Sequence, residues 1–187
     1  MRTTWMAGVL TAAAFIWPGP PSAAQDKGKT EAAELAGESQ AALQKLSGSV
    51  PLAKSLGPKA AAILVFPKVT KAGLGIGGQY GEGSLLKKGS AVAYYKTTGA
   101  SFGLQAGGQK YGYAMFFMNA KALDDFVNAS GFEVGVGPSV VLVDEGMAKT
   151  TTTTTLKDDI YAFVFGQKGL MAGLGIQGNK ITKITPK

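Results

Sequence analysis

The sequence contains no cysteine and no histidine, and its only arginine and both tryptophans lie at or before Trp17. Without cysteine there is no disulfide framework and no thiol nucleophile. Without histidine the commonest general base and the commonest zinc ligand are both missing. With no arginine after Arg2, the chain has no bidentate clamp for a phosphate group. These absences argue against an enzyme, and we expect no catalytic residues, no metal site and no cofactor.

The first residues have the pattern of a targeting segment. Arg2 provides a positive start, residues 6–17 are apolar, and residues 18–24 combine proline with small residues. This pattern predicts a signal peptide over residues 1–24, cleaved after Ala24. The apolar run is shorter than the roughly 20 residues that span a bilayer. We therefore expect an exported protein, periplasmic or associated with the cell envelope, whose mature chain has no transmembrane span.

Lysine carries all the positive charge of the expected mature chain. Removing Arg2 from the 19 basic residues leaves 18 lysines against 12 acidic residues, a net charge of +6. One interpretation is that this charge only aids solubility. The other is attraction to anionic lipid head groups, worth about 1 kcal/mol per lysine near such a surface. Nucleic acid is disfavoured by export and by the lack of arginine. The candidate lipid-binding residues are lysines that cluster in the sequence: Lys54, Lys59, Lys68, Lys71, Lys87 and Lys88.

The segment before residue 60 predicts two helices. Residues 25–30 are polar, and we expect a disordered leader there. A helix should then begin near Thr30 and end at Ser47-Gly48, followed by a short helix over residues 51–56. The apolar stripe of this pair is thin and rich in alanine, which predicts a lid on the domain rather than a core element.

The rest of the chain reads mostly as strands, which makes residues 31–187 a single domain. One helix interrupts them, with Asn119 as its N-cap and Gly131 at its end. Strands follow one another without regular βαβ alternation, which favours an α+β fold: N-terminal helices packed on a strongly bent, Gly-rich antiparallel sheet or partly closed barrel. The expected strands are residues 60–66 (stopped by Pro67), 73–86, 91–106, 111–118, 132–143, 160–165 and 170–176.

Two glycine-rich segments nearly repeat each other. Residues 72–78 read Ala-Gly-Leu-Gly-Ile-Gly-Gly and residues 172–178 read Ala-Gly-Leu-Gly-Ile-Gln-Gly. Glycine at alternate positions strips one face of a strand of side chains, which suits close approach of another backbone or a bend in the sheet. A dinucleotide-binding loop would need a helix to follow, and residues 79–84 do not start one. Both segments are therefore interpreted as structural.

The acidic residues form no obvious catalytic pair. Adjacent carboxylates occur at residues 124–125, 144–145 and 158–159. Neighbouring side chains point apart on a helix or a strand, so neither member of a pair assists the other in acid–base chemistry. No calcium-loop spacing is present either.

Several segments together resemble the SYLF domain family, over roughly residues 32–184. They are residues 100–109, 115–119, 122–123, 135–138 and 161–178. Fungal and animal members bind phosphoinositides or other acidic phospholipids, and some also bind actin. Bacterial members resemble exported, lipid-binding envelope proteins. The resemblance implies a phospholipid-binding module, and no individual ligand residue is transferred from it.

Two further function classes stay open beside lipid binding. The exposed glycine-rich sheet suits a protein-interaction or structural module of the envelope that adds a partner's strand. A periplasmic enzyme is disfavoured by the missing histidine, cysteine and arginine. The preferred interpretation is binding of an anionic phospholipid or membrane surface through lysines and the N-terminal helices.

Overall fold

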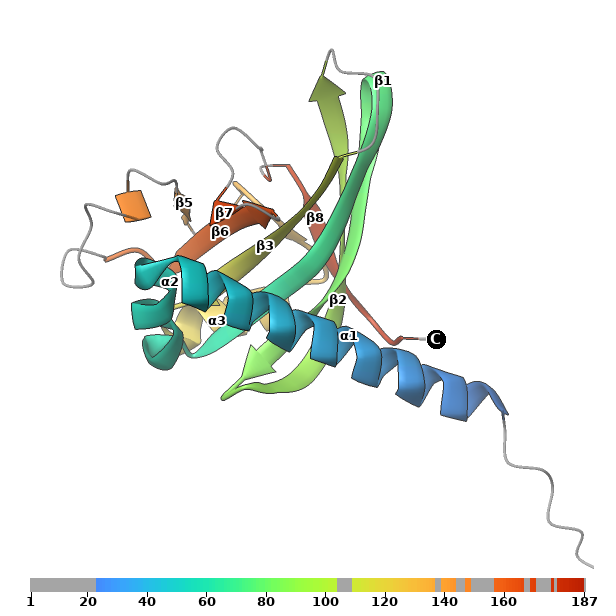
Figure 1. Cartoon of the computed structure of the whole chain (residues 1–187), viewed down its shortest axis with the longest axis horizontal. Helices are drawn as coiled ribbons and strands as arrows, with labels where there is room; N and C mark the ends of the chain where they lie inside the picture. Colours follow the sequence, from blue (N-terminus) through green and yellow to red (C-terminus); the bar gives the residue numbers. More distant parts are fainter. Residues whose placement is uncertain are drawn as a thin grey trace, which may run out of the picture.

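The structure is a computed structural model, which describes residues 23–103, 109–136, 139–143, 147–148, 157–166, 169–170, 176 and 178–186. In this part of the chain, helices accompany the strands of one sheet (Figure 1). The helices are α1 (Ala23–Ser49), α2 (Pro51–Leu56), η1 (Gly57–Lys59) and α3 (Ala120–Asn128). The strands are β1 (Ala62–Lys87), β2 (Ser90–Gly103), β3 (Gln109–Phe117), β4 (Phe132–Glu133), β5 (Val140–Val143), β6 (Ile160–Gly166), β7 (Gly169–Leu170) and β8 (Lys180–Ile184).

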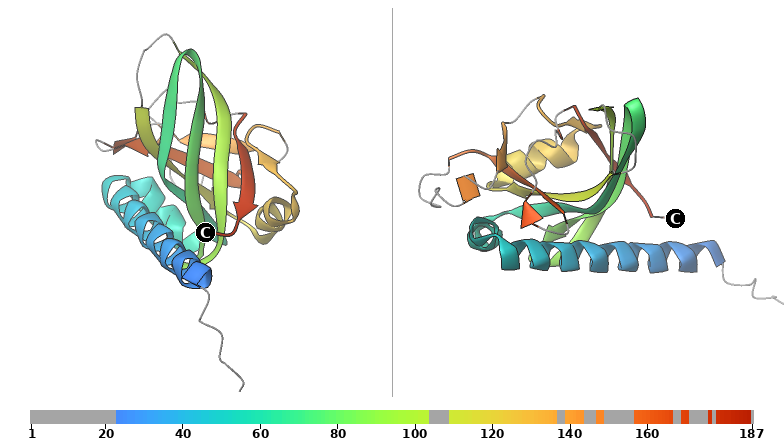
Figure 2. Two further views of the ribbon diagram at one scale, coloured as in Figure 1. Left: turned by 90° about the vertical axis from the view of Figure 1, so that its right-hand side faces the viewer. Right: turned by 45° about the horizontal axis from the view of Figure 1, so that its top comes forward.

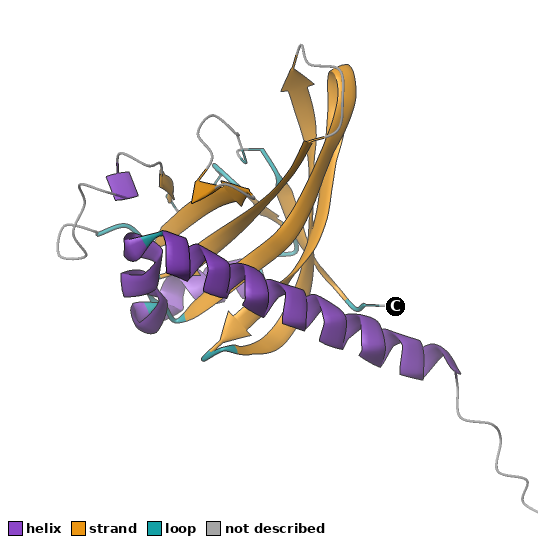
Figure 3. Cartoon of the chain, viewed as in Figure 1, coloured by secondary structure: helices purple, strands orange, loops and turns teal. Residues whose placement is uncertain are grey.

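The strands form a single strongly bent sheet, so the predicted α+β class is confirmed (Figure 3). Their order is β4-β8-β2-β1-β3-β6-β5, with β7 paired to β6. The sheet is mixed rather than wholly antiparallel, because β5 runs parallel to β6. The connection over residues 144–159 is long enough for the crossover that a parallel pair needs.

Strand β1 folds back on itself at its glycine-rich middle. A Cβ added to Gly77 would lie 2.7 Å from the Cα of Gly73, and one added to Gly81 would lie 2.8 Å from the carbonyl oxygen of Lys68. The two halves of the 26-residue ribbon therefore lie side by side, as Figure 1 shows at the β1 label. This confirms the structural interpretation of the first glycine repeat. Most of the second repeat, residues 171–175 and 177, lies outside the described residues.

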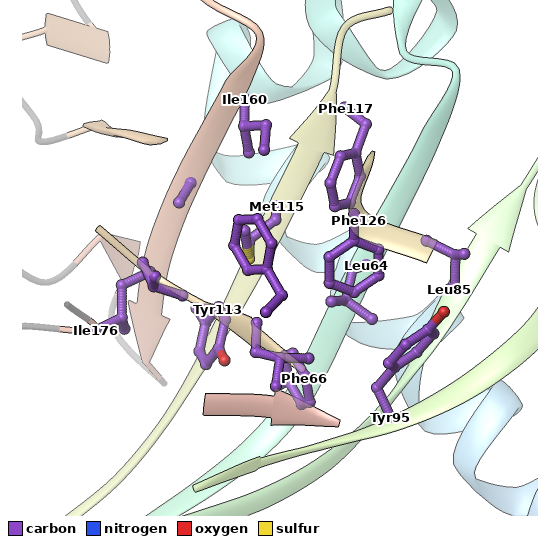
Figure 4. Close-up of a cluster of buried hydrophobic side chains, with 14 of the residues drawn as sticks. Leu64, Phe66, Leu85, Tyr95, Tyr113, Met115, Phe117, Phe126, Ile160 and Ile176 are labelled. Carbon is purple, nitrogen blue, oxygen red and sulfur yellow. The ribbon is translucent and has the colours of Figure 1, made fainter. Parts of the chain in front are cut away.

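The two faces of the sheet carry two separate hydrophobic clusters, with α1 and α2 on one face and α3 on the other (Figure 2). On the α3 face, Phe126 packs against the rings of Tyr95 and Phe117 (Figure 4), each at a centroid distance of 4.9 Å. It also contacts the ring of Phe132 at 5.3 Å. On the α1 face, the helices contribute Leu46, Leu52, Ala53 and Leu56 to the cluster, and Val50 between α1 and α2 is buried with them. The helical pair is thus part of the core, and the prediction of a lid is wrong.

Helix α1 is longer than the sequence predicted. It begins at Ala23 and includes residues 25–30, which we expected to be a disordered leader. Alanine, glutamine and lysine are good helix formers, and each added residue contributes one backbone hydrogen bond once a helix is nucleated. Two contacts fix its middle to the sheet: Ser39 Oγ donates to Val65 O at 3.4 Å and Gln40 Nε2 to Gly89 O at 2.7 Å.

After β3, the predicted N-cap of α3 is confirmed, but the strand predicted over residues 132–143 is not continuous. Asn119 caps α3 by accepting a 2.8 Å hydrogen bond from the Ala122 amide, as predicted. The helix ends at Asn128, three residues before Gly131. The expected strand over residues 132–143 is divided into β4 and β5, because Gly135 adopts a positive φ of 98° and turns the chain.

Candidate functional site

A bulge interrupts the pairing of β1 with β3 at Pro67. Phe66 pairs with Tyr113 and Val69 with Tyr111, so Pro67 and Lys68 together face the single residue Gly112. Two residues opposite one is the pattern of a β-bulge, and proline is tolerated there because no ladder hydrogen bond is lost. The strand therefore continues through Pro67, where the sequence predicted its end.

The bulge changes the face on which Lys68 lies. Leu64 and Phe66 point to the α3 face, and so does Val69 after the bulge. Strict alternation from Phe66 would have sent Lys68 into that core as well. The extra residue shifts the alternation by one, and Lys68 is exposed on the α1 face instead.

A groove of about 450 Å³ lies on that face, between α1, the bulge, β3 and the end of β6. Among the described residues that line it, Lys45, Lys68 and Lys110 are exposed lysines on separate elements and none is acidic. The other described lining residues are uncharged: Ala42, Pro67, Tyr111, Gly112, Phe165 and Gly166. We refer to this site as the lysine groove. Ammonium groups around an apolar floor suit an anionic group attached to a hydrocarbon.

The floor of the lysine groove depends on Gly112. A Cβ at this position would lie 2.5 Å from Phe165 Cε2 and 2.9 Å from the carbonyl oxygen of Pro67. Only glycine lets the Phe165 ring lie over β3 beside the bulge, because any side chain there would displace the ring or the bulge.

The six predicted lysines do not form one cluster. Lys68 alone lines the groove. Lys71 is partly buried on β1 opposite Gln109. Lys54 and Lys59 are exposed on α2 and η1. Lys87 and Lys88 are exposed at the turn between β1 and β2, which falls between the expected strands 73–86 and 91–106; Lys88 and Gly89 have φ of 51° and 82°, as in a type I′ hairpin turn.

Sequence reasoning missed Lys45 and Lys110. The nearest lysine in the sequence is nine residues from Lys45 and eleven from Lys110, so neither belongs to a visible cluster. They meet Lys68 only because α1 crosses the bulged part of the sheet. The proline within an otherwise apolar strand was the available signal, and it was read as a strand end instead of a bulge.

A polar network is buried on the opposite face. Tyr111 donates to Gln79 Oε1 at 2.5 Å, Gln79 Nε2 donates to Asn179 Oδ1, and Tyr113 donates to Thr97 Oγ1 at 2.7 Å. Burial raises the pKa of Tyr111 to about 12, while the nearby Asn179 amide acts in the opposite direction. Burial likewise raises the pKa of the fully enclosed Tyr113. Burial therefore keeps these phenols protonated at neutral pH, and the hydroxyl of Tyr111, which also lines the groove, is directed to Gln79.

The acidic residues that the structure describes do not assemble into a site. No three histidine, cysteine, aspartate or glutamate side chains come together among them. Asp125 pairs with Lys121 at 2.6 Å on the surface of α3, and Asp158 contacts the Tyr161 hydroxyl at 3.2 Å. The pair at residues 144–145 lies outside the described residues.

Residues 98–185 match the family model Ysc84, described as "Las17-binding protein actin regulator". The matched part includes Lys110, Gly112 and Phe165 of the lysine groove, whereas Lys45 and Lys68 precede it. No curated protein matches the chain. Among the helices that the structure describes, none is long and apolar enough to cross a membrane.

Proposed function

Residues 98–185 form a Ysc84-family (SYLF) domain, and from this premise we propose that the protein is a non-catalytic module that binds anionic phospholipid. The family identity agrees with the resemblance found in the sequence and points to a binding role. The choice of lipid rests on one observation, the convergence of three lysines from three elements around an apolar groove.

The chemistry of the lysine groove fits a phospholipid head group. Lys45, Lys68 and Lys110 supply positive charge without the fixed fork of arginine, so they attract a phosphate as point charges. The Phe165 ring and Pro67 offer contact to the glycerol and the first methylene groups. Among the lining residues that the structure describes, no carboxylate competes for the ammonium groups.

The experiment is cosedimentation with vesicles of phosphatidylcholine alone and with an equal part of phosphatidylglycerol, over a salt series. Replacing Lys45, Lys68 and Lys110 by glutamine should weaken binding to the acidic vesicles about a hundredfold at low salt, from about 1 kcal/mol per lysine. The matched control replaces Lys29, Lys157 and Lys183, which are equally exposed and remove the same charge. If the two variants lose the same affinity for acidic vesicles, only the net charge matters. If the affinity does not change with salt concentration, the electrostatic mechanism is excluded.

A protein partner is the second candidate, favoured by the description of the family as Las17-binding. Strand addition along the glycine-rich β1 is excluded, because β1 pairs with β2 on one side and β3 on the other. Among the described strands the sheet ends at β4 and β5, and β5 exposes Leu142. A Leu142→Lys variant that loses a partner but keeps vesicle binding would support this candidate.

We also propose that the protein is exported and cleaved after Ala24, as its first residues indicate. The intact mass of the exported form tests this, since it should begin at Gln25. A mass that includes Trp17 would contradict it.

A further inference from the structure

The point where β1 reverses is unusually apolar for an exposed hairpin end. Residues 72–81, Ala-Gly-Leu-Gly-Ile-Gly-Gly-Gln-Tyr-Gly, contain no charged residue. Ile76 is 73% exposed and Tyr80 is 49% exposed. Exposed turns normally carry asparagine, aspartate, serine or proline beside glycine. A large aliphatic side chain held in solvent at such a turn indicates a partner that accepts it.

Ile76 and Tyr80 point to the same face as the lysine groove. Gln79 lies on the α3 face, where it contacts Tyr111 and Asn179. Successive side chains of a strand alternate, so Tyr80 and Ile76 both point to the α1 face. Lys68 lies beside Gly81, and Gly81 is five residues from Ile76 along the strand. At about 3.4 Å per residue, the groove is therefore roughly 17 Å from Ile76.

We infer that the β1 reversal is a membrane-insertion element that places Ile76 in the apolar edge of an anionic bilayer. The inference rests on the proposed function and adds to it the orientation of the protein on the membrane. With the reversal inserted and the hairpin tilted, Lys68 and Lys110 face the head groups on the same side of the sheet. Tyr80 lies between Ile76 and the groove, at the level where amphipathic aromatic rings settle in an interface. The charge of the groove selects a lipid surface over an uncharged apolar partner.

The carboxylate of Glu82 lies near Tyr80 on this surface, and it has a hydrogen-bond partner. The Tyr80 hydroxyl donates a hydrogen bond to Glu82 Oε1. Glu82 also lies opposite Lys96 in the pairing of β1 with β2. These neighbours lower the repulsion between Glu82 and acidic lipids.

The test uses a single cysteine in the full chain, which is simple because the sequence has none. Ile76→Cys is labelled with the polarity-sensitive dye NBD and mixed with phosphatidylcholine vesicles, with and without an equal part of phosphatidylglycerol. The matched control is Val92→Cys, which is 57% exposed and lies toward the opposite end of the β1–β2 ribbon. We expect blue-shifted, brighter emission at position 76 with acidic vesicles, quenching by nitroxide lipids, and no change at position 92.

The outcomes separate this inference from the proposed function. If acidic vesicles sediment the labelled protein while NBD at position 76 is unchanged, the insertion is wrong and lipid binding stands. If position 92 shifts instead, the end that carries Lys87 and Lys88 faces the membrane. A shift that grows with protein concentration in the absence of lipid would assign the reversal to a second copy of the chain. No vesicle binding at all would overturn both proposals.

A second variant tests the energetic role of the side chain. Ile76→Ser should reduce partitioning into acidic vesicles about tenfold, because it removes an aliphatic side chain from the interface. Thermal unfolding should be unchanged, since the side chain is mostly in solvent in the free protein. Unchanged partitioning would exclude insertion of Ile76.

Discussion

At the scale of single residues, the two glycine repeats meet through the residues that follow them. Gln79 follows the first repeat and Asn179 the second, and the Gln79 amide donates to Asn179 Oδ1. Their strands flank β2 from opposite sides, with Gly99 between them. An added Cβ on Gly99 would lie 3.0 Å from Gln79 Nε2 and 3.1 Å from Asn179 Cγ. Glycine at position 99 is what leaves room for this buried contact.

Gly99→Ala should therefore destabilise the protein by about 1–3 kcal/mol, by forcing the two buried amides apart. Gly78→Ala is the control, because an added Cβ there meets nothing within 4 Å. Its effect should stay within about 0.5 kcal/mol. Urea unfolding of both variants gives the comparison, and equal stabilities would mean that the amides tolerate the methyl group.

The buried Tyr111 predicts a loss of stability at high pH. Its pKa rises from 10.0 to about 12 in the folded protein, so the phenol stays protonated after the unfolded chain has begun to ionise. The unfolded state then binds fewer protons, and the free energy of unfolding falls as the pH rises from 10 toward 12. Tyr113, whose pKa is raised in the same direction, adds to the effect.

Tyr111→Phe should change this dependence in a defined direction. At about pH 8 the variant lacks the hydrogen bond to Gln79 and should be less stable by about 1 kcal/mol. By about pH 11 the difference should shrink by roughly 1 kcal/mol, because the variant lacks the ionising phenol. Denaturant titrations of the parent protein and the variant at the two pH values measure this difference in unfolding free energy. A difference that stays constant would show that Tyr111 ionises alike in both states.

At the scale of elements, α3 shows how local signals set a boundary. Its start is fixed by Asn119, whose side chain accepts from the Ala122 amide and also donates to Asp159 at 2.5 Å. Asn119→Ala should cost about 1 kcal/mol of stability. Asn119→Ser keeps a capping oxygen and should cost less. If serine is as damaging as alanine, the contact with Asp159 matters more than the cap.

Such local signals explain which elements the sequence could predict. The cap of α3, the turn at Lys87-Lys88 and the tight approach at the glycines of β1 depend on neighbouring residues, and they were predictable. The bulge at Pro67 was not, because a proline ends a strand or enters a bulge according to its partner strand. The parallel pairing of β5 also depends on a distant partner.

The candidate site was less predictable than the fold for the same reason. Lys68 was found because it lies near other lysines in the sequence. Lys45 and Lys110 join it through the crossing of α1 over the sheet, which no local pattern encodes. Clustering along the chain is a poor guide to clustering in space when a strand folds back on itself, as β1 does.

At the scale of the whole molecule, the fold-back of β1 separates the candidate lysines. The reversal forms one end of the β1–β2 ribbon and the Lys87-Lys88 turn forms the other end, while the lysine groove lies between them, since Gly81 beside Lys68 is five residues from Ile76 and six from Lys87. A flat membrane that contacts the first end leaves the second at a distance greater than the roughly 8 Å over which salt screens charge. The orientation proposed above therefore predicts unequal roles for two lysine pairs of the same charge.

Reversing Lys68 and Lys110 to glutamate should weaken binding to acidic vesicles by about 1 kcal/mol or more per position at low salt. Reversing Lys87 and Lys88 changes the net charge equally but should weaken it by less, because that turn points away from the surface. Both pairs are exposed, so thermal unfolding should be similar for the two variants. Cosedimentation at several salt concentrations provides the comparison, with the difference between the pairs shrinking as salt rises. If the Lys87 and Lys88 variant loses more affinity than the groove variant, the molecule docks by its other end, and the β1 reversal faces away from the membrane.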